Sequence, residues 1–152
     1  RGTSLRLYLP RTDNANNDQA ASDSAMTIDA GAGTILVVED DPDVRDLVVN
    51  LLQELDYQVL EAEDGDSAMS VLESSRHIDI LFTDVVLPGE MNGTEIARRA
   101  LAELPDIKVM LTTGYAESTL GDITLGGAIS GIIRKPYRKN ELAEALARLN
   151  RA

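Results

Sequence analysis

The sequence contains no cysteine, and among its 152 residues there is a single histidine. A chain without cysteine fits a reducing compartment, so we expect a cytoplasmic domain. No apolar run reaches the ~18 residues that a membrane-spanning helix needs, and no charged and then apolar signal peptide opens the chain. The formal charge of -12 argues against direct contact with nucleic acid or with an anionic membrane surface.

The chain divides into three parts. Residues 12–33 are rich in Asn, Asp, Ala, Ser and Gly and cannot bury enough apolar surface to offset their ordering entropy, so we interpret them as a flexible linker. Residues 1–11 carry leucines that alternate with other residues, which is a strand pattern. Because one strand is not stable alone, this segment is interpreted as the remnant of a preceding domain. Residues 34–152 are long enough for one ordinary domain.

Strand-like and helix-like segments alternate in this third part. The strands predicted from continuous apolar runs are 34–39, 58–62, 78–84, 107–113 and a fifth that ends with 131–135. Helical patterns fill the intervals, including a weak one at 115–127 that glycines interrupt, and the last helix is predicted at 138–150. Five such units with apolar strands predict an α/β fold, a doubly wound parallel sheet with helices on both faces.

The first predicted helix has a clear start signal. Asp41 is a suitable N-cap, and Pro42 suits the first turn. Apolar residues then recur at helical spacing and predict a single face directed at the sheet. The residues predicted on this face are Val44, Leu47, Val48, Leu51, Leu52 and Leu55.

Polar and charged residues stand where the predicted strands end. Glu39 and Asp40 close the first strand, Asp84 the third, Thr113 the fourth and Lys135 the fifth. Ligands of open parallel sheets bind beyond the carboxyl ends of the strands, so these residues should converge on one edge. Crowded carboxylates raise one another's pKa unless a cation lies among them. The pattern therefore predicts an oxygen-lined site for a hard divalent cation, most plausibly Mg²⁺.

These residue types also support phosphoryl transfer. A carboxylate that is not consumed as a metal ligand can attack a phosphoryl group and form an aspartyl phosphate. Asp84 is the best candidate nucleophile because it stands alone at the end of the central strand. Lys135 and the Thr113 hydroxyl can neutralise the phosphoryl oxygens, which is most of what such a transfer requires.

Four motifs carry a resemblance to a known family. The segments "ILVVEDD", "LFTDVVLPG", "VMLTTGY" and "IIRKPY", in this order and spacing, resemble the receiver domain of two-component response regulators. The resemblance covers about residues 34–149. It implies a flavodoxin-like fold with strand order 2-1-3-4-5, Mg²⁺ as cofactor and a phosphohistidine as the phosphoryl donor.

The resemblance also implies roles for single residues. Asp84 becomes the phosphoacceptor, and Glu39 and Asp40 form the acidic pair of the family. Asp40 and Asp84 would bind the metal directly, Glu39 largely through water, and Val86 through its backbone carbonyl.

The other implied residues surround the phosphoryl group. Thr113 would bind it, and Lys135 would pair with it. A cis peptide bond would join Lys135 to Pro136.

The chain departs from the family at the position that often carries a switch Tyr or Phe, where it has Ile132. This departure argues against a rotating aromatic ring as its signalling device. Val86 and Tyr115 occupy the positions that flank the attacking water, and neither can orient it, so we expect slow autodephosphorylation.

Two further features resemble receivers fused to sensor kinases. The loop "PGEMNG", 88–93, is one residue longer than in the plainest receivers, and it occurs together with "TTGY". Residues 2–11 resemble the end of a histidine-kinase ATP-binding domain. We therefore expect the C-terminal part of a hybrid histidine kinase, with the parent membrane-anchored or not. Its partner would be the dimerisation and phosphotransfer domain of a histidine kinase, in its own or a partner chain, or a separate histidine phosphotransfer protein.

Several alternatives stay open at this stage. The acids after the first strand can be a solvated helix-cap cluster, and Asp41 is interpreted as only that. The receiver can be a stand-alone single-domain response regulator or can act without phosphorylation. A phosphatase of the haloacid-dehalogenase type uses similar residues, but it needs an acid at the position of Val86. Enzymatic activity beyond self-phosphorylation and autodephosphorylation is therefore uncertain. The single histidine, His77, is interpreted as a surface residue.

Overall fold

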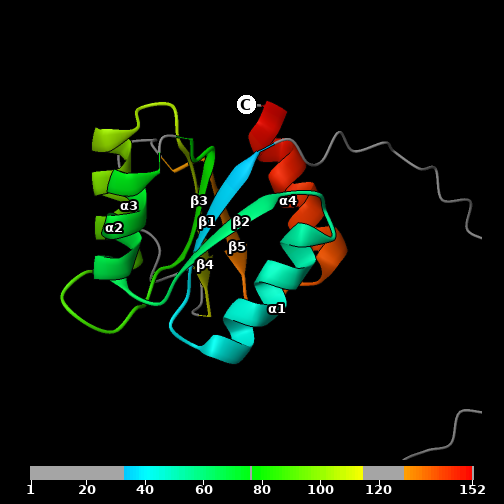
Figure 1. The fold of residues 1–152 in the computed structure, drawn as a ribbon. Helices are drawn as coiled ribbons and strands as arrows, with labels where there is room; N and C mark the ends of the chain where they lie inside the picture. Colours follow the sequence, from blue (N-terminus) through cyan, green and yellow to red (C-terminus); the bar gives the residue numbers. More distant parts are fainter. Residues whose placement is uncertain (1–32, 76, 115–128, 152) are drawn as a thin grey trace, which may run out of the picture.

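A computed structural model describes residues 33–75, 77–114 and 129–151. In this part of the chain a parallel sheet has the strand order β2-β1-β3-β4-β5 (Figure 1). The strands are β1 (Thr34–Val38), β2 (Gln58–Ala62), β3 (Ile80–Asp84), β4 (Lys108–Thr113) and β5 (Gly131–Arg134). The helices are α1 (Pro42–Gln53), α2 (Gly65–Ser74), α3 (Gly93–Glu103) and α4 (Lys139–Arg151). The predicted fold class and strand order are confirmed. The helix predicted at 115–127, the N-terminal strand and the linker lie outside the described residues, apart from Gly33.

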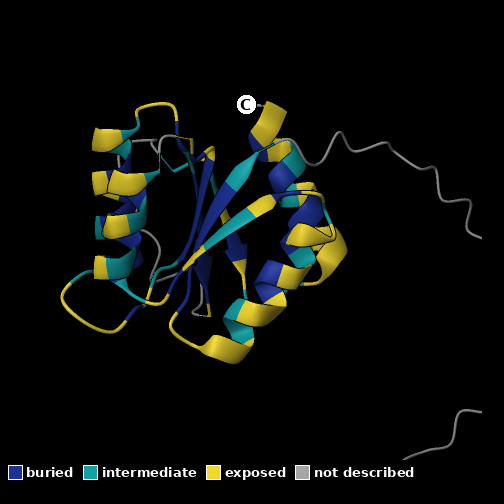
Figure 2. Cartoon of the chain, in the orientation of Figure 1, coloured by how far each residue is buried: buried dark blue, intermediate teal, exposed yellow. Residues whose placement is uncertain are grey.

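The helices cover both faces of the sheet. Helices α2 and α3 lie on one face, and α1 and α4 lie on the other (Figure 1). Each face has its own apolar core, because successive strand residues point in opposite directions. Leu36 and Val38 of β1 pack on the α2 and α3 side, whereas Ile35 and Val37 pack on the α1 and α4 side. The central strands are buried and the outer helix faces are exposed (Figure 2). None of the described helices is long and apolar enough to cross a bilayer.

The strand register brings the predicted site residues to one edge. Val38 is paired with Thr83, so Glu39 follows β1 at the level where Asp84 ends β3. Asp84 is paired with Thr112, and Thr113 with Arg134, the residue before Lys135. The carboxyl ends of β1, β3, β4 and β5 therefore meet at the same height.

Helix α1 begins as predicted, but its buried face is turned relative to the face that the sequence indicated. The Asp41 carboxylate accepts hydrogen bonds from the backbone N–H groups of Asp43, at 2.9 Å, and Val44, at 3.2 Å. Leu47 is 57% exposed, so its predicted place in the core is wrong, and Val49 is buried instead. Leu47 and Val49 lie about 100° to either side of Val48, and the side of the helix that carries Val49 is the one turned toward the core.

Several strands were also predicted one or two residues too long. The apolar runs include Ile78 and Ile107, and the first predicted strand includes Glu39. All three residues are buried, but each stands just outside a strand. An apolar run reports burial, whereas a strand is defined by its hydrogen bonds, so the two boundaries differ by one or two residues.

Candidate functional site

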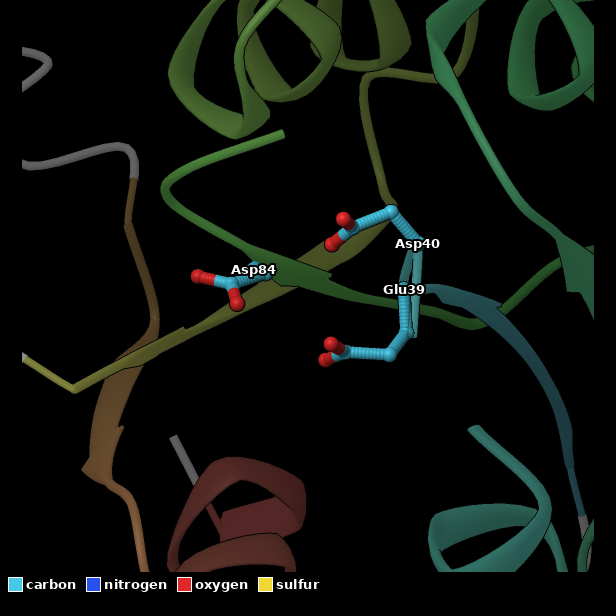
Figure 3. Close-up of side chains that lie close together, drawn as sticks. All are labelled: Glu39, Asp40 and Asp84. Atoms are coloured by element: carbon cyan, nitrogen blue, oxygen red, sulfur yellow. The ribbon is translucent and has the colours of Figure 1, made fainter. Parts of the chain in front are cut away.

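Three carboxylates meet at the ends of β1 and β3. Glu39, Asp40 and Asp84 each offer an oxygen atom, and these atoms lie within 4.8 Å of one another (Figure 3). Their surroundings differ, because Glu39 is only 4% exposed, Asp84 is half-buried and Asp40 is exposed to solvent. The structure thus brings together the three acids that the sequence placed at strand ends.

Lys135 lies against two of these acids. Its Nζ atom donates to Glu39 Oε2 and to Asp84 Oδ2, each at 2.6 Å. The Lys135 backbone N–H donates to the carbonyl oxygen of buried Thr113 at 2.8 Å, which fixes the end of β5 against the end of β4. The peptide bond between Lys135 and Pro136 is cis, as the resemblance implied. The ammonium group therefore bridges the two strand ends that carry Glu39 and Asp84.

Burial and charge shift the pKa values of this pair. Burial raises the pKa of the Glu39 carboxyl above its ordinary value, and the hydrogen bond and charge of Lys135 oppose that rise. The nearby charges of Asp84 and Asp40 raise it further. Burial by itself would lower the pKa of Lys135, but its hydrogen bonds to Asp84 and Glu39 more than compensate and raise it. Lys135 thus stays protonated as the counter-charge of the acidic cluster.

Asp84 is held at both carboxylate oxygens and at its backbone. Its Oδ1 atom accepts a hydrogen bond from the Val86 backbone N–H at 3.0 Å, while Oδ2 accepts from Lys135. Its carbonyl oxygen accepts from the Thr83 hydroxyl at 3.1 Å. The nucleophile predicted from the sequence is therefore orientated by its neighbours before any ligand is present.

The donor set fits a hard divalent cation. Carboxylate oxygens from Glu39, Asp40 and Asp84 are the ligands that Mg²⁺ prefers, and the exposure of Asp40 leaves room for the water molecules that Mg²⁺ retains. In the described part of the chain, Lys135 contacts two of these acids and forms no ion pair with Asp40. Asp40 therefore remains available to a cation from solution.

The other residues singled out from the sequence are exposed at the surface or lie outside the described residues. Ile132 is exposed on β5, so it does not pack in the core. The Val86 side chain is exposed next to Asp84. Tyr115 lies outside the described residues. His77 is exposed, as its interpretation as a surface residue requires.

Tyr137 was missed by the sequence reasoning. Its ring meets Phe82 edge-to-face, with the ring centroids 6.1 Å apart and an interplanar angle of 84°. Its hydroxyl group is buried and has no hydrogen-bond partner among the described residues. Burial raises the pKa of Tyr137, and the charges of Glu39 and Asp84 add to this rise. The signal in the sequence was an aromatic residue two positions after the strand-end lysine.

Comparison with known proteins identifies the family. Residues 35–147 match the family model of the response regulator receiver domain. The chain therefore belongs to the receiver domains of two-component response regulators, as the four motifs implied.

Relatives of two kinds match the chain. The response regulator receiver protein CpdR of Brucella abortus is 34% identical over 115 residues, which cover 76% of this chain and 94% of that protein. The sensor kinase CckA of Brucella abortus is 32% identical over 151 residues, which cover 94% of this chain. This chain spans only 16% of that kinase.

Solved structures of receivers have the same fold. The response regulator TrrA of Thermotoga maritima, in complex with Mg²⁺ and BeF, matches with a TM-score of 0.68 and 30% identity, over 78% of this chain and 99% of that one. The receiver domain of a signal transduction histidine kinase from Syntrophus aciditrophicus matches with a TM-score of 0.68 and 31% identity, over 78% and 89% of the two chains.

Proposed function

We propose that the domain accepts a phosphoryl group from a phosphohistidine onto Asp84 and transmits the signal through protein contacts. The observation that carries this proposal is the contact of Lys135 Nζ with Asp84 Oδ2 inside the acidic cluster. A structural ion pair would need only one acid. Here the lysine stands beside a carboxylate that two further acids crowd, at the sheet edge where ligands of this fold bind.

The transfer is a displacement at phosphorus. An oxygen of ionised Asp84 attacks the phosphorus atom, the P–N bond to the donor imidazole breaks, and the imidazole leaves with the electron pair of that bond. Lys135 and the Thr113 hydroxyl stabilise the negative charge on the phosphoryl oxygens. Asp40, Asp84 and the Val86 carbonyl would hold Mg²⁺ directly, and Glu39 would hold it through water. The metal would supply further charge neutralisation.

Phosphorylation by a small donor tests the proposal directly. Acetyl phosphate with Mg²⁺ should add one hydroxylamine-sensitive phosphate to the wild-type chain, measured as a mass increase. Asp84→Asn should abolish this increase. Asp66→Asn changes an exposed acid on α2 and should leave it intact. A wild-type chain that takes up no phosphate, or an Asp84→Asn chain that still does, overturns the assignment.

We propose in addition that the domain is the C-terminal part of a hybrid histidine kinase. The match to the sensor kinase covers 94% of the chain, which is more than the receiver domain occupies. The resemblance of residues 2–11 to the end of a kinase ATP-binding domain supports the same arrangement. The kinase's own dimerisation and phosphotransfer domain, or a separate histidine phosphotransfer protein, is then the phosphoryl partner. The match to CpdR, which covers 94% of that protein, favours the alternative, a stand-alone regulator.

The size of the native protein separates these two arrangements. An antibody raised against this chain should detect a product several times larger than 16.4 kDa in cells that express the native gene. A native product close to 16.4 kDa would favour the stand-alone regulator instead.

A further inference from the structure

The first residue of α3 lies directly against the backbone of Asp84. A Cβ atom placed on Gly93 would lie 1.9 Å from the Asp84 carbonyl oxygen and 2.8 Å from its carbonyl carbon. The Gly93 N–H donates to the Val85 carbonyl at 3.1 Å, which holds the two segments together. Only a residue without a side chain fits between α3 and the end of β3.

Thr83 contacts the same carbonyl group. It is fully buried, and its hydroxyl donates to the Asp84 carbonyl oxygen at 3.1 Å. The Thr83 Oγ1 atom also lies 3.0 Å from the position of a Gly93 Cβ. Gly93 and Thr83 therefore both lie against the carbonyl group of Asp84.

Helix α3 cannot easily move away from this contact. Ile96, Ala97 and Ala100 are fully buried in the core between α3 and the sheet. The Asn92 side chain caps the helix by accepting the Glu95 backbone N–H at 2.9 Å. A side chain at position 93 would therefore displace the Asp84 backbone by about 1 Å or more, since core packing resists movement of the helix.

Such a displacement would move the Asp84 carboxylate relative to Lys135. Lys135 Nζ, which donates to Oδ2, follows a different strand and would not move with Asp84, whereas the Val86 N–H, which donates to Oδ1, lies two residues further along the same segment. Phosphoryl transfer depends on alignment, and a misplacement of ~1 Å can reduce a rate about a hundredfold.

We propose that Gly93 and Thr83 are positioning residues for the phosphoacceptor, setting the place of Asp84 through its backbone. This inference rests on the proposed function, since it concerns the reactivity of the same carboxylate. It predicts that changes at either position reduce phosphorylation of molecules that are still folded.

The first test replaces Gly93 in the full chain. Gly93→Ala should reduce the rate constant of phosphorylation by acetyl phosphate and Mg²⁺ at least tenfold, counted per folded molecule by circular dichroism. Ile96→Val is the matched control, because it loosens the same helix without approaching Asp84. The control should keep the wild-type rate per folded molecule. An unchanged rate in Gly93→Ala, or an equal reduction in Ile96→Val, would overturn the positioning role.

The second test keeps the proposal falsifiable if Gly93→Ala does not fold. Thr83→Val preserves the branched shape but removes the hydroxyl, whereas Thr83→Ser preserves the hydroxyl. Thr83→Val should react about fivefold more slowly, and Thr83→Ser should recover the wild-type rate. Equal rates in the two variants contradict the inference. A wild-type chain that is not phosphorylated contradicts the proposed function itself, so the two failures can be distinguished.

Discussion

The two edges of the sheet use charged side chains in different ways. At the amino edge, two charged side chains complete the hydrogen bonding of nearby backbone. Asp79 accepts the Thr34 backbone N–H at 2.7 Å, and Lys108 Nζ donates to the Leu149 carbonyl at the end of α4, at 2.9 Å. Each of these side chains forms a hydrogen bond with a backbone N–H or carbonyl group at the end of a strand or helix, where regular backbone partners are missing.

At the carboxyl edge the charged groups face one another instead. Glu39, Asp40 and Asp84 crowd together, and within the described part of the chain Lys135 lies between them and forms ion pairs with Glu39 and Asp84 but not with Asp40. Like charges at this distance oppose folding, and burial of Glu39 adds a desolvation cost. The amino edge is thus arranged for stability, whereas the carboxyl edge keeps a negative charge excess that a bound cation could neutralise.

The largest effect should come from removing the lysine at each edge. Lys135→Ala leaves the buried Glu39 carboxylate without its cation, and we expect the free energy of unfolding to fall by about 2–3 kcal/mol at pH 7. Lys108→Ala removes one hydrogen bond at the amino edge and should lower it by only about 1 kcal/mol. Urea denaturation of both variants measures the difference. Similar losses in the two variants would contradict the contrast between the edges.

The contact between Glu39 and Lys135 also predicts that stability depends on pH. The pKa of Glu39 is raised in the folded state, so its ionised form opposes folding at high pH. Loss of Lys135 removes the groups that lower this pKa, and the carboxyl of Lys135→Ala should therefore take up a proton at a higher pH. The loss of unfolding free energy in Lys135→Ala should shrink as the pH falls through that folded-state pKa of Glu39. The loss in Lys108→Ala should not depend on pH in this way. Denaturation at pH 7 and pH 5 checks this, and a constant deficit for Lys135→Ala is the contrary result.

Magnesium should act on the carboxyl edge alone. Because the cation relieves repulsion in the folded state, Mg²⁺ at ten times its Kd should stabilise the wild type by about 1.4 kcal/mol and raise its Tm. The double variant Asp40→Asn/Asp84→Asn should lose this increase. Asp79→Asn removes an acid at the amino edge and should keep it. An equal Tm increase in the double variant and the wild type would exclude this site as the place where Mg²⁺ binds.

The sequence predicted the site better than it predicted the packing. Strand ends in a parallel sheet converge whatever their detailed geometry, so the order of the motifs was enough to bring Glu39, Asp84 and Lys135 together. Leu47 was misplaced because periodicity shows an apolar face but not how the helix is turned toward the sheet. Gly93 and Tyr137 were missed because their importance depends on close approaches between segments that only the three-dimensional structure reveals.

We expect the lifetime of a phosphoryl group on Asp84 to depend on the apolar surface beside it. Val86 is exposed there and offers no group that can orient an attacking water. The double variant Val86→Asn/Tyr115→Glu should therefore shorten the half-life of the phosphate severalfold in Mg²⁺ buffer. Leu47→Asn changes an equally exposed apolar residue on α1 and should leave the half-life unchanged. The water-exclusion argument is wrong if the double variant loses phosphate no faster than the wild type.

The hydroxyl groups of two tyrosines also differ between the two edges, and the expected effect on stability is smaller. Tyr57 lies at the amino edge, where its hydroxyl accepts a hydrogen bond from Asn150 Nδ2 at 3.1 Å. Tyr137 lies at the carboxyl edge, where its buried hydroxyl has no partner among the described residues. Replacing tyrosine by phenylalanine should therefore have opposite consequences at the two positions, because one variant loses a hydrogen bond and the other loses an unsatisfied polar group.

We expect Tyr57→Phe to lower the free energy of unfolding by about 0.5–1 kcal/mol and Tyr137→Phe to raise it by a similar amount. The edge-to-face contact of Tyr137 with Phe82 does not involve the hydroxyl, so the phenylalanine ring should preserve it. Urea denaturation of the two variants in metal-free buffer gives the comparison. A loss of stability in Tyr137→Phe would mean that the hydroxyl has a partner in solution, such as an ordered water molecule next to Glu39, and that the carboxyl edge is better satisfied than its side-chain contacts indicate.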